Sequence, residues 1–203
     1  MIAIIDYGVG NLFSLKSTFN MLEHKSVVTS DPDTIKNASR IILPGVGAFE
    51  DASKKLRESG LFSLVLDEAK AGKAILGICL GMQMLFEKSY EYGEHQGLGL
   101  INGNVKAIRD VVPKGAGIPH IGWNSLDFKN GKSPLFKYIN EGDYVYFVHS
   151  YYGADCDEFV IATTDYYQPL TAAVQKDNVM GTQFHPEKSG ETGLKILKAF
   201  CEI

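Results

Sequence analysis

The chain has 203 residues, of which 45% are hydrophobic and 22% are charged, and its formal net charge is −4. A chain of this length is expected to form one domain over residues 1–203, with a core that needs no disulfide or metal to support it. The mildly acidic balance argues against a nucleic-acid partner, because neutralising phosphates requires clustered Lys and Arg. Three widely spaced cysteines, no 18-residue apolar run and no secretory signal predict a reduced, cytoplasmic protein without membrane contact.

From residue 1 to about 88, short β-branched runs alternate with segments of helical periodicity. The runs are Ile2–Ile5, Arg40–Leu43 and Ala74–Ile78, and the first helical segment carries Leu12, Leu15, Phe19 and Leu22. This alternation predicts βαβ units around a parallel sheet.

Between residues 97 and 184 the apolar runs become shorter and closer, and Gly, Asp, Asn and Pro separate them. This spacing is typical of largely antiparallel strands. The runs are Asn104–Ile108, Tyr144–His149, Phe159–Thr163, Thr171–Gln175 and Val179–Phe184. The tail 190–200 returns to helical spacing, which predicts a helix packed on the sheet through Leu194, Leu197 and Phe200.

The strongest local pattern is a Gly-x-Cys-x-Gly turn centred on Cys79. A buried-type strand leads into it, and an apolar-periodic segment to Phe86 that predicts a helix follows it. This is the cysteine counterpart of the nucleophile elbow, in which small residues such as Gly77 and Gly81 permit the tight turn. A helix N-terminus would favour the thiolate, and the Leu80 N–H could donate to a developing oxyanion. From this segment alone, a small buried hydrophobic role for Cys79 is about equally well supported.

A nucleophilic cysteine needs a base and a group that orients the base. Among five histidines, only His185 has an informative carboxylate: in Phe184-His185-Pro186-Glu187, extended backbone points His185 and Glu187 the same way. Alone, this motif is more often a surface turn. His149 lacks such a carboxylate, and its strand end is interpreted as a wall of a substrate or partner site. Cys79 and His185 are 106 positions apart in the chain, so only the fold can bring them together.

Two glycine-containing loops follow predicted strands. Asp6–Asn11 lacks the third glycine of a dinucleotide-binding loop, and Pro44–Ala48 lacks both that glycine and the Lys-Ser/Thr of a phosphate-binding loop. The second loop could aim a backbone N–H into a neighbouring site, although a plain turn is equally well supported. No spacing of His, Cys, Asp and Glu resembles a metal site, so we expect neither metal nor cofactor.

With these residues assembled, the chain closely resembles the class I, triad-type glutamine amidotransferases over its whole length. The segments 77–83 and His185-Pro186-Glu187 carry this resemblance. Segments 6–12, 43–47, 119–124 and 146–151 resemble, more specifically, the glutaminase subunits of imidazole glycerol phosphate synthases. The resemblance implies a three-layer, flavodoxin-like α/β fold with a mixed, mostly parallel central sheet, helices on both faces and a smaller antiparallel sheet.

The resemblance also implies roles for particular residues. Cys79 would attack the glutamine side-chain amide, His185 would act as base and acid, and Glu187 would orient His185. The oxyanion would be held by backbone N–H groups of Leu80 and of Val46 or Gly47. Positions that bind the substrate in this family are Gln83, His149, Ser150 and Tyr151, and positions that line its subunit interface are Asn11, Trp123, Tyr146 and Lys188.

The family's partner is a (β/α)8-barrel cyclase subunit, with which it forms a heterodimer and to which it delivers ammonia for histidine biosynthesis. Free ammonia is mostly protonated at neutral pH and loses its nucleophilicity in bulk water, so a closely attached acceptor enzyme is chemically sensible. The alternative is a paralogous amidotransferase that supplies another synthase, for example in amino-sugar biosynthesis. For Trp123 and Tyr146, ordinary core packing is as well supported as an interface role.

Overall fold

The computed structural model describes all residues, 1–203, and is built around an eight-stranded sheet in the order β2-β1-β3-β4-β14-β13-β12-β9. Its strands are β1 (Ile2–Ile5), β2 (Ser26–Thr29), β3 (Arg40–Leu43), β4 (Ala74–Ile78), β9 (Asp127–Phe128), β12 (Val160–Asp165), β13 (Pro169–Lys176) and β14 (Val179–Thr182). The first five strands in the spatial order are parallel, and the remaining pairs are antiparallel. The expected mixed, mostly parallel sheet is therefore confirmed.

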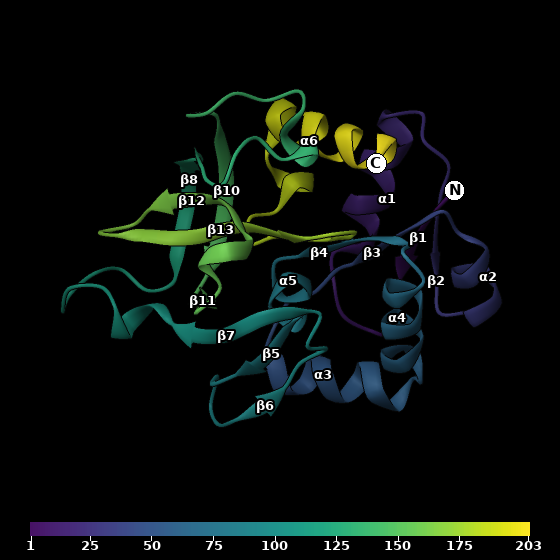
Figure 1. The fold of residues 1–203 in the computed structure, drawn as a ribbon, viewed down its shortest axis with the longest axis horizontal. Helices are drawn as coiled ribbons and strands as arrows, with labels where there is room; N and C mark the ends of the chain where they lie inside the picture. The colour runs from purple at the N-terminus through teal and green to yellow at the C-terminus, as the bar shows by residue number, and fades with distance from the viewer.

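Helices cover both faces of this sheet, α1 and α6 on one and α3 and α4 on the other (Figure 1). They are α1 (Leu12–Met21), α2 (Pro32–Asn37), α3 (Phe49–Glu58), α4 (Leu61–Lys70), α5 (Leu80–Met84) and α6 (Gly190–Glu202). In the expected tail helix, Leu197 and Phe200 are fully buried, whereas Leu194 is only half-buried.

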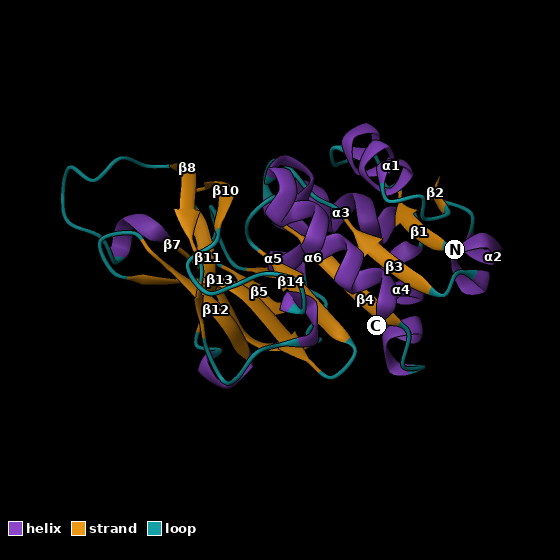
Figure 2. Ribbon diagram, turned by 90° about the horizontal axis from the view of Figure 1, so that it is seen from above, coloured by secondary structure: helices purple, strands orange, loops and turns teal.

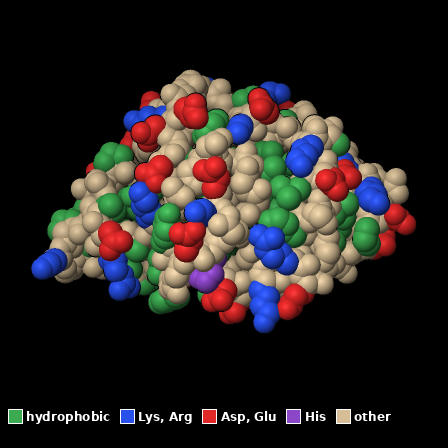
Figure 3. All heavy atoms as spheres, turned by 60° about the horizontal axis from the view of Figure 1, so that its bottom comes forward, with side chains coloured by type: hydrophobic (Ala, Val, Ile, Leu, Met, Phe, Trp, Pro, Cys, Tyr) green, Lys and Arg blue, Asp and Glu red, His purple; other side chains and the backbone are tan.

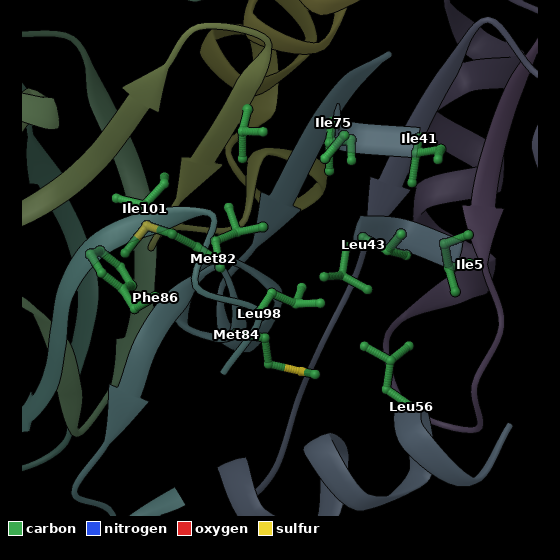
Figure 4. Packing of buried hydrophobic residues seen from close by; sticks show 14 of the residues in the cluster. Ile5, Ile41, Leu43, Leu56, Ile75, Met82, Met84, Phe86, Leu98 and Ile101 are labelled. Atoms are coloured by element: carbon green, nitrogen blue, oxygen red, sulfur yellow. The ribbon is translucent and has the colours of Figure 1, made fainter. Parts of the chain in front are cut away.

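Two apolar clusters fill the space between the sheet and its helices. Alternate residues of β1 point to opposite faces, so Ile2 and Ile4 join the cluster under α1 and α6, while Ala3 and Ile5 join the other. The second cluster extends beyond the large sheet to the segment after β4, where Met84 and other residues pack beside the helices (Figure 4). The parallel strands are thus buried on both faces, as their continuous apolar runs require.

A four-stranded sheet, in the order β11-β7-β5-β6, packs beside the large one. Its strands are β5 (Phe86–Ser89), β6 (His95–Gln96), β7 (Ile101–Ala107) and β11 (Tyr151–Ala154). Two of its pairings are antiparallel as expected, but β5 and β7 are parallel. A separate antiparallel ribbon of β8 (His120–Ser125) and β10 (Tyr144–His149) lies at the end of the molecule away from β2 and α2 (Figure 2).

Two sequence expectations need correction. The helix expected to run to Phe86 ends at Met84, because the carbonyls of Met84 and Leu85 accept N–H groups of residues 98, 100 and 101 instead of continuing the helix. The last expected antiparallel strand, β14, pairs in parallel with β4 on one side and antiparallel with β13 on the other. This second difference is what brings residues 79 and 185 together.

Charged side chains of both signs are interspersed on the face below the large sheet, with apolar patches between them (Figure 3). That face has no single-sign field of the kind that attracts a polyanion. No helix is both long enough and apolar enough to span a bilayer.

Candidate active site

Cys79 lies immediately after β4, between the carboxyl ends of two parallel neighbours, β3 and β14. Its backbone N–H donates to the carbonyl oxygen of Thr182, the last residue of β14, at 2.7 Å. Its backbone adopts φ +55° and ψ −111°, a conformation that non-glycine residues rarely take and that costs about 1–3 kcal/mol. The turn therefore holds the thiol at the sheet edge where parallel strands of α/β proteins build their sites.

Three glycines make this turn possible because no side chain would fit at their positions. A Cβ on Gly81 would lie 1.9 Å from the carbonyl oxygen of Leu43, and one on Gly77 would lie 2.6 Å from the carbonyl oxygen of Gly81. A Cβ on Gly45 would lie 2.7 Å from the Gly81 nitrogen. The loop after β3 is thus pressed against the start of α5, which carries Val46 and Gly47 to the sulfur's surroundings.

His185 and Glu187 lie just beyond β14, at the short 3-10 turn η4 (Pro186–Lys188). His185 Nδ1 lies 2.8 Å from Glu187 Oε1, and both side chains are almost completely buried. Burial alone would lower the pKa of His185, but hydrogen bonds to Cys79 and Glu187 outweigh it and raise that pKa to about 9. The imidazole thus lies between the thiol and the carboxylate and is held in its charged form.

A cavity of about 300 Å³ opens over the sulfur. Of the residues expected at the site, Glu187 lies behind His185 and does not line it. Those that do are Val46, Gly47, Cys79, Leu80, Gln83, His149, Ser150, Tyr151, His185 and Lys188. The structure therefore brings together the catalytic, oxyanion and substrate positions that the sequence indicated, although they come from four separate segments.

A hydrogen-bonded network forms one wall of the cavity. His149 Nδ1 lies 2.9 Å from the carbonyl oxygen of Tyr151, which can only accept, so Nδ1 carries the hydrogen. His149 Nε2 then accepts from His120 Nδ1 at 3.0 Å. Burial lowers the pKa of His149 to about 3 and that of His120 to about 4. His149 is thus a neutral wall residue with both ring nitrogens engaged, and it is unsuited to act as the base.

The four expected interface residues come from different elements of the fold. Lys188 lines the cavity, whereas Asn11 caps α1 by accepting from the Ser14 N–H. Trp123 and Tyr146 face each other across the β8–β10 ribbon with ring centroids 6.0 Å apart. Trp123 is 55% exposed, so core packing does not explain it.

Sequence reasoning missed two polar residues at this site. Glu91 is buried in the cavity wall, and its Oε2 accepts from the N–H of Phe49 at the start of α3, at 2.7 Å. Gln183 is fully buried and reaches Cys79 Sγ. The period-2 alternation that pairs His185 with Glu187 also places Gln183 on that side, so a signal for Gln183 was present; Glu91 lies in an irregular turn with no such signal. No group of three or more His, Cys, Asp and Glu side chains could hold a metal ion.

The chain is similar to known proteins over its whole length. A profile of the family "Glutamine amidotransferase class-I" matches residues 3–203. "Imidazole glycerol phosphate synthase subunit HisH" of Caldanaerobacter subterraneus subsp. tengcongensis is 51% identical over 100% of this chain and 98% of its own length. The subunit of the same name from Oceanobacillus iheyensis is 50% identical over 100% and 99%.

Solved structures share the fold at lower identity. A crystal structure described as glutamine amidotransferase has a TM-score of 0.77 at 18% identity and covers 100% of this chain and 98% of that one. The structure of PurLQS from Thermotoga maritima has a TM-score of 0.74 at 21% identity, covering 99% and 97%. Together with the full-length relatives, these findings establish that the chain belongs to the class I glutamine amidotransferase family, among the HisH subunits of imidazole glycerol phosphate synthase.

Proposed function

We propose that this chain hydrolyses glutamine to glutamate and ammonia at Cys79 and passes the ammonia to the cyclase subunit of imidazole glycerol phosphate synthase. The observation that carries the proposal is the buried array in which the charged His185 lies between Cys79 and Glu187 at the floor of a cavity. A thiolate paired with an imidazolium is already the attacking form of a cysteine nucleophile.

In the first half-reaction the Cys79 thiolate attacks the side-chain amide carbon of glutamine, and a C–S bond forms. Charge moves to the amide oxygen, where the N–H groups of Leu80 and of the Val46–Gly47 loop can donate to it. Each such donor is worth about 3–4 kcal/mol in comparable sites. His185 then gives its proton to the nitrogen, the C–N bond breaks, and ammonia leaves a glutamyl thioester.

In the second half-reaction water attacks the thioester. Neutral His185 takes the proton of the water as its oxygen bonds to carbon, and the same N–H groups stabilise the second oxyanion. The C–S bond then breaks, which releases glutamate and restores the thiolate and imidazolium. Glu187 orients His185 through both steps because its Oε1 lies 2.8 Å from Nδ1, which leaves Nε2 for the reacting groups.

The cavity wall offers suitable partners for the charged ends of free glutamine. Both hydrogens of Gln83 Nε2 are used, since this nitrogen donates to the Tyr151 carbonyl and to Gln183 Oε1, each at 3.1 Å. Gln83 Oε1 and the second oxygen of Glu91 therefore remain as acceptors for the α-ammonium group. Because both ring nitrogens of His149 are engaged, they are not free to bind the α-carboxylate. The α-carboxylate would instead contact Ser150 and the backbone groups of the segment that follows His149.

The β8–β10 ribbon provides an apolar surface suited to a partner subunit. Ile121, Trp123 and Tyr144 are each more than half exposed there, and aromatic side chains on such a surface are typical anchors of protein interfaces. The register pairs Trp123 with Tyr146, and Tyr146 accepts the backbone N–H of His185 on its carbonyl at 3.0 Å. We propose that the (β/α)8-barrel cyclase docks here and at Asn11 and Lys188, forming a cytoplasmic heterodimer.

Glutamate release from glutamine, by the chain alone and mixed with the histidine-pathway cyclase of the same organism and its nucleotide ligand, tests the proposal. We expect release to rise strongly only in the complete mixture. A rate indifferent to the cyclase would contradict the proposed acceptor and direct the search to another synthase, such as one of amino-sugar biosynthesis. Absence of release under every condition, with the chain folded, would contradict the proposed chemistry itself.

A further inference from the structure

The sulfur of Cys79 has a second polar neighbour besides His185. Gln183 follows the last residue of β14, its side chain is fully buried, and its Nε2 lies 3.7 Å from Cys79 Sγ, within the range of hydrogen bonds to sulfur. Its backbone N–H donates to the Ala172 carbonyl at 2.8 Å, which continues the pairing with β13 and fixes where the side chain starts. The Gln183 amide is thus a built part of the turn that contains the nucleophile.

The neighbours of the Gln183 amide determine which of its ends faces the sulfur. The Tyr151 carbonyl can only accept, so Gln83 must present its NH2 group to it. The other hydrogen of that NH2 group points to Gln183, 3.1 Å away, and requires an oxygen there. Gln183 must therefore turn its Oε1 to Gln83 and its own NH2 group to Cys79.

The same carbonyl also anchors the far end of the network. His149 donates to it from Nδ1 at 2.9 Å, and His120 on β8 donates to His149 at 3.0 Å. His120 is itself clamped between Phe147 and Tyr166, with ring centroids 4.8 and 4.1 Å away. Buried hydrogen-bond networks of this kind hold each member in one orientation, because a reversed amide would leave buried groups unpaired.

We propose that Gln183 is a further catalytic residue of the glutaminase site, which donates a hydrogen bond to the Cys79 sulfur and favours its thiolate. An N–H bonds more strongly to a negatively charged acceptor than to a neutral one, so the bond stabilises thiolate relative to thiol. The sulfur then lies between two donors, the imidazolium of His185 and the amide of Gln183. When the tetrahedral intermediate collapses and the C–S bond breaks, the same N–H stabilises the negative charge that returns to the sulfur.

Two substitutions separate this role from a packing role. Gln183→Glu keeps the shape and the oxygen that accepts from Gln83 but removes the donor, and Gln183→Met removes both without adding charge. We expect both to lower kcat about 10- to 100-fold with KM little changed, and to slow alkylation of Cys79 by iodoacetamide at pH 7 in parallel. Gln175→Glu makes the same chemical change on β13, where its Oε1 accepts from Ser133, and should alter neither rate.

Unchanged kcat and alkylation rates in folded variants would overturn the proposal, as would a loss of kcat without slower alkylation. The alkylation readout also keeps this proposal distinct from the glutaminase assignment, because it requires no glutamine. Should neither variant fold, NMR of the unmutated chain decides. One Gln183 amide proton should shift downfield on thiol ionisation and shift back when Cys79 is alkylated, and an amide signal indifferent to both would overturn the proposal.

Discussion

Two corners of the site hold buried histidines in opposite states. At the first, His185 lies between a thiol and a carboxylate, and its pKa is raised to about 9. At the second, His120 and His149 have only each other, a backbone carbonyl and aromatic rings, and their pKa values are lowered to about 4 and 3. The first corner can transfer protons near neutral pH, and the second cannot.

The difference shows that burial disfavours the charged form of every histidine, and that the hydrogen-bond partners decide whether its pKa ends up low or high. All three imidazoles are buried, so desolvation disfavours the charged form of each. Only His185 has anionic partners that reverse the effect. The neutral pair of His120 and His149 supplies fixed hydrogen-bond donors and acceptors in the cavity wall. The charged array of Cys79, His185 and Glu187 carries out the reaction.

The largest expected effect comes from removing the thiol. Cys79→Ala should reduce glutamate release by about 10⁴-fold or more, since nucleophile and base act as a unit. It should also lower the pKa of His185, because a major bond to the imidazolium is lost; NMR titration of that ring measures this. Cys156→Ala, at a buried cysteine outside the cavity, is the control and should leave release intact. Glutamate release that survives Cys79→Ala would contradict the assigned nucleophile.

Removing the charge behind His185 should have the next largest effect. Glu187→Gln is expected to lower kcat by roughly 10²- to 10⁴-fold, because the amide no longer fixes the tautomer or supports the imidazolium. KM for glutamine should change little. Steady-state kinetics measure the split, with Glu191→Gln on the exposed start of α6 as the control. Equal losses in kcat and in glutamine affinity would mean that Glu187 shapes the binding site rather than orienting His185.

The neutral corner should affect stability at acid pH. Unfolded His120 takes up a proton near pH 6.5, whereas the folded residue does so only near pH 4. The unfolded state therefore binds more protons in this window, and the free energy of unfolding should fall by about 2–3 kcal/mol per such histidine as pH drops through it. His120→Phe should flatten that slope in urea titrations, while half-buried His24→Gln should leave most of it. An unchanged slope would contradict the neutral pair.

The smallest expected effect concerns how kcat/KM depends on pH. Because the imidazolium of His185 supplies the proton to the leaving nitrogen, kcat/KM should fall as pH rises through about 9. Initial rates across the alkaline range measure this limb. A limb near pH 6.5, the usual histidine value, would show that His185 is not held in its charged form.

Much of the fold could be read from the sequence because local pattern and tertiary role agree there. The runs Ile2–Ile5, Arg40–Leu43 and Ala74–Ile78 are β1, β3 and β4 with the expected bounds, since strands buried on both faces must be continuously apolar. The direction of β14 could not be predicted, because an apolar run is the same whether its neighbour is parallel or antiparallel. The helix after Cys79 was predicted, but its length was overestimated, because its end depends on N–H groups from residues 98, 100 and 101.

The candidate site shows the same difference between residues that a local pattern fixes and residues that distant contacts fix. Positions fixed by a local turn, such as Cys79 between its glycines, are visible in sequence, and so is the alternation that aligns His185 with Glu187. Glu91 could not be found in this way, because its place in the cavity depends on the Phe49 N–H at the start of a helix 42 residues earlier. Residues whose role depends on one distant backbone group leave no pattern.

The acceptor-only carbonyl of Tyr151 has a consequence for proton conduction. Beyond the direct His120–His149 contact, the path to the sulfur runs through the Tyr151 carbonyl and the amides of Gln83 and Gln183, which neither give up nor take up a proton at ordinary pH. The network therefore cannot serve as a proton wire. On this side of Cys79 the hydrogen-bonded network blocks proton transfer. The proton that the thiol loses can therefore pass only to His185. It cannot travel toward the β8–β10 ribbon, because the carbonyl and amide groups on that path do not exchange protons at ordinary pH.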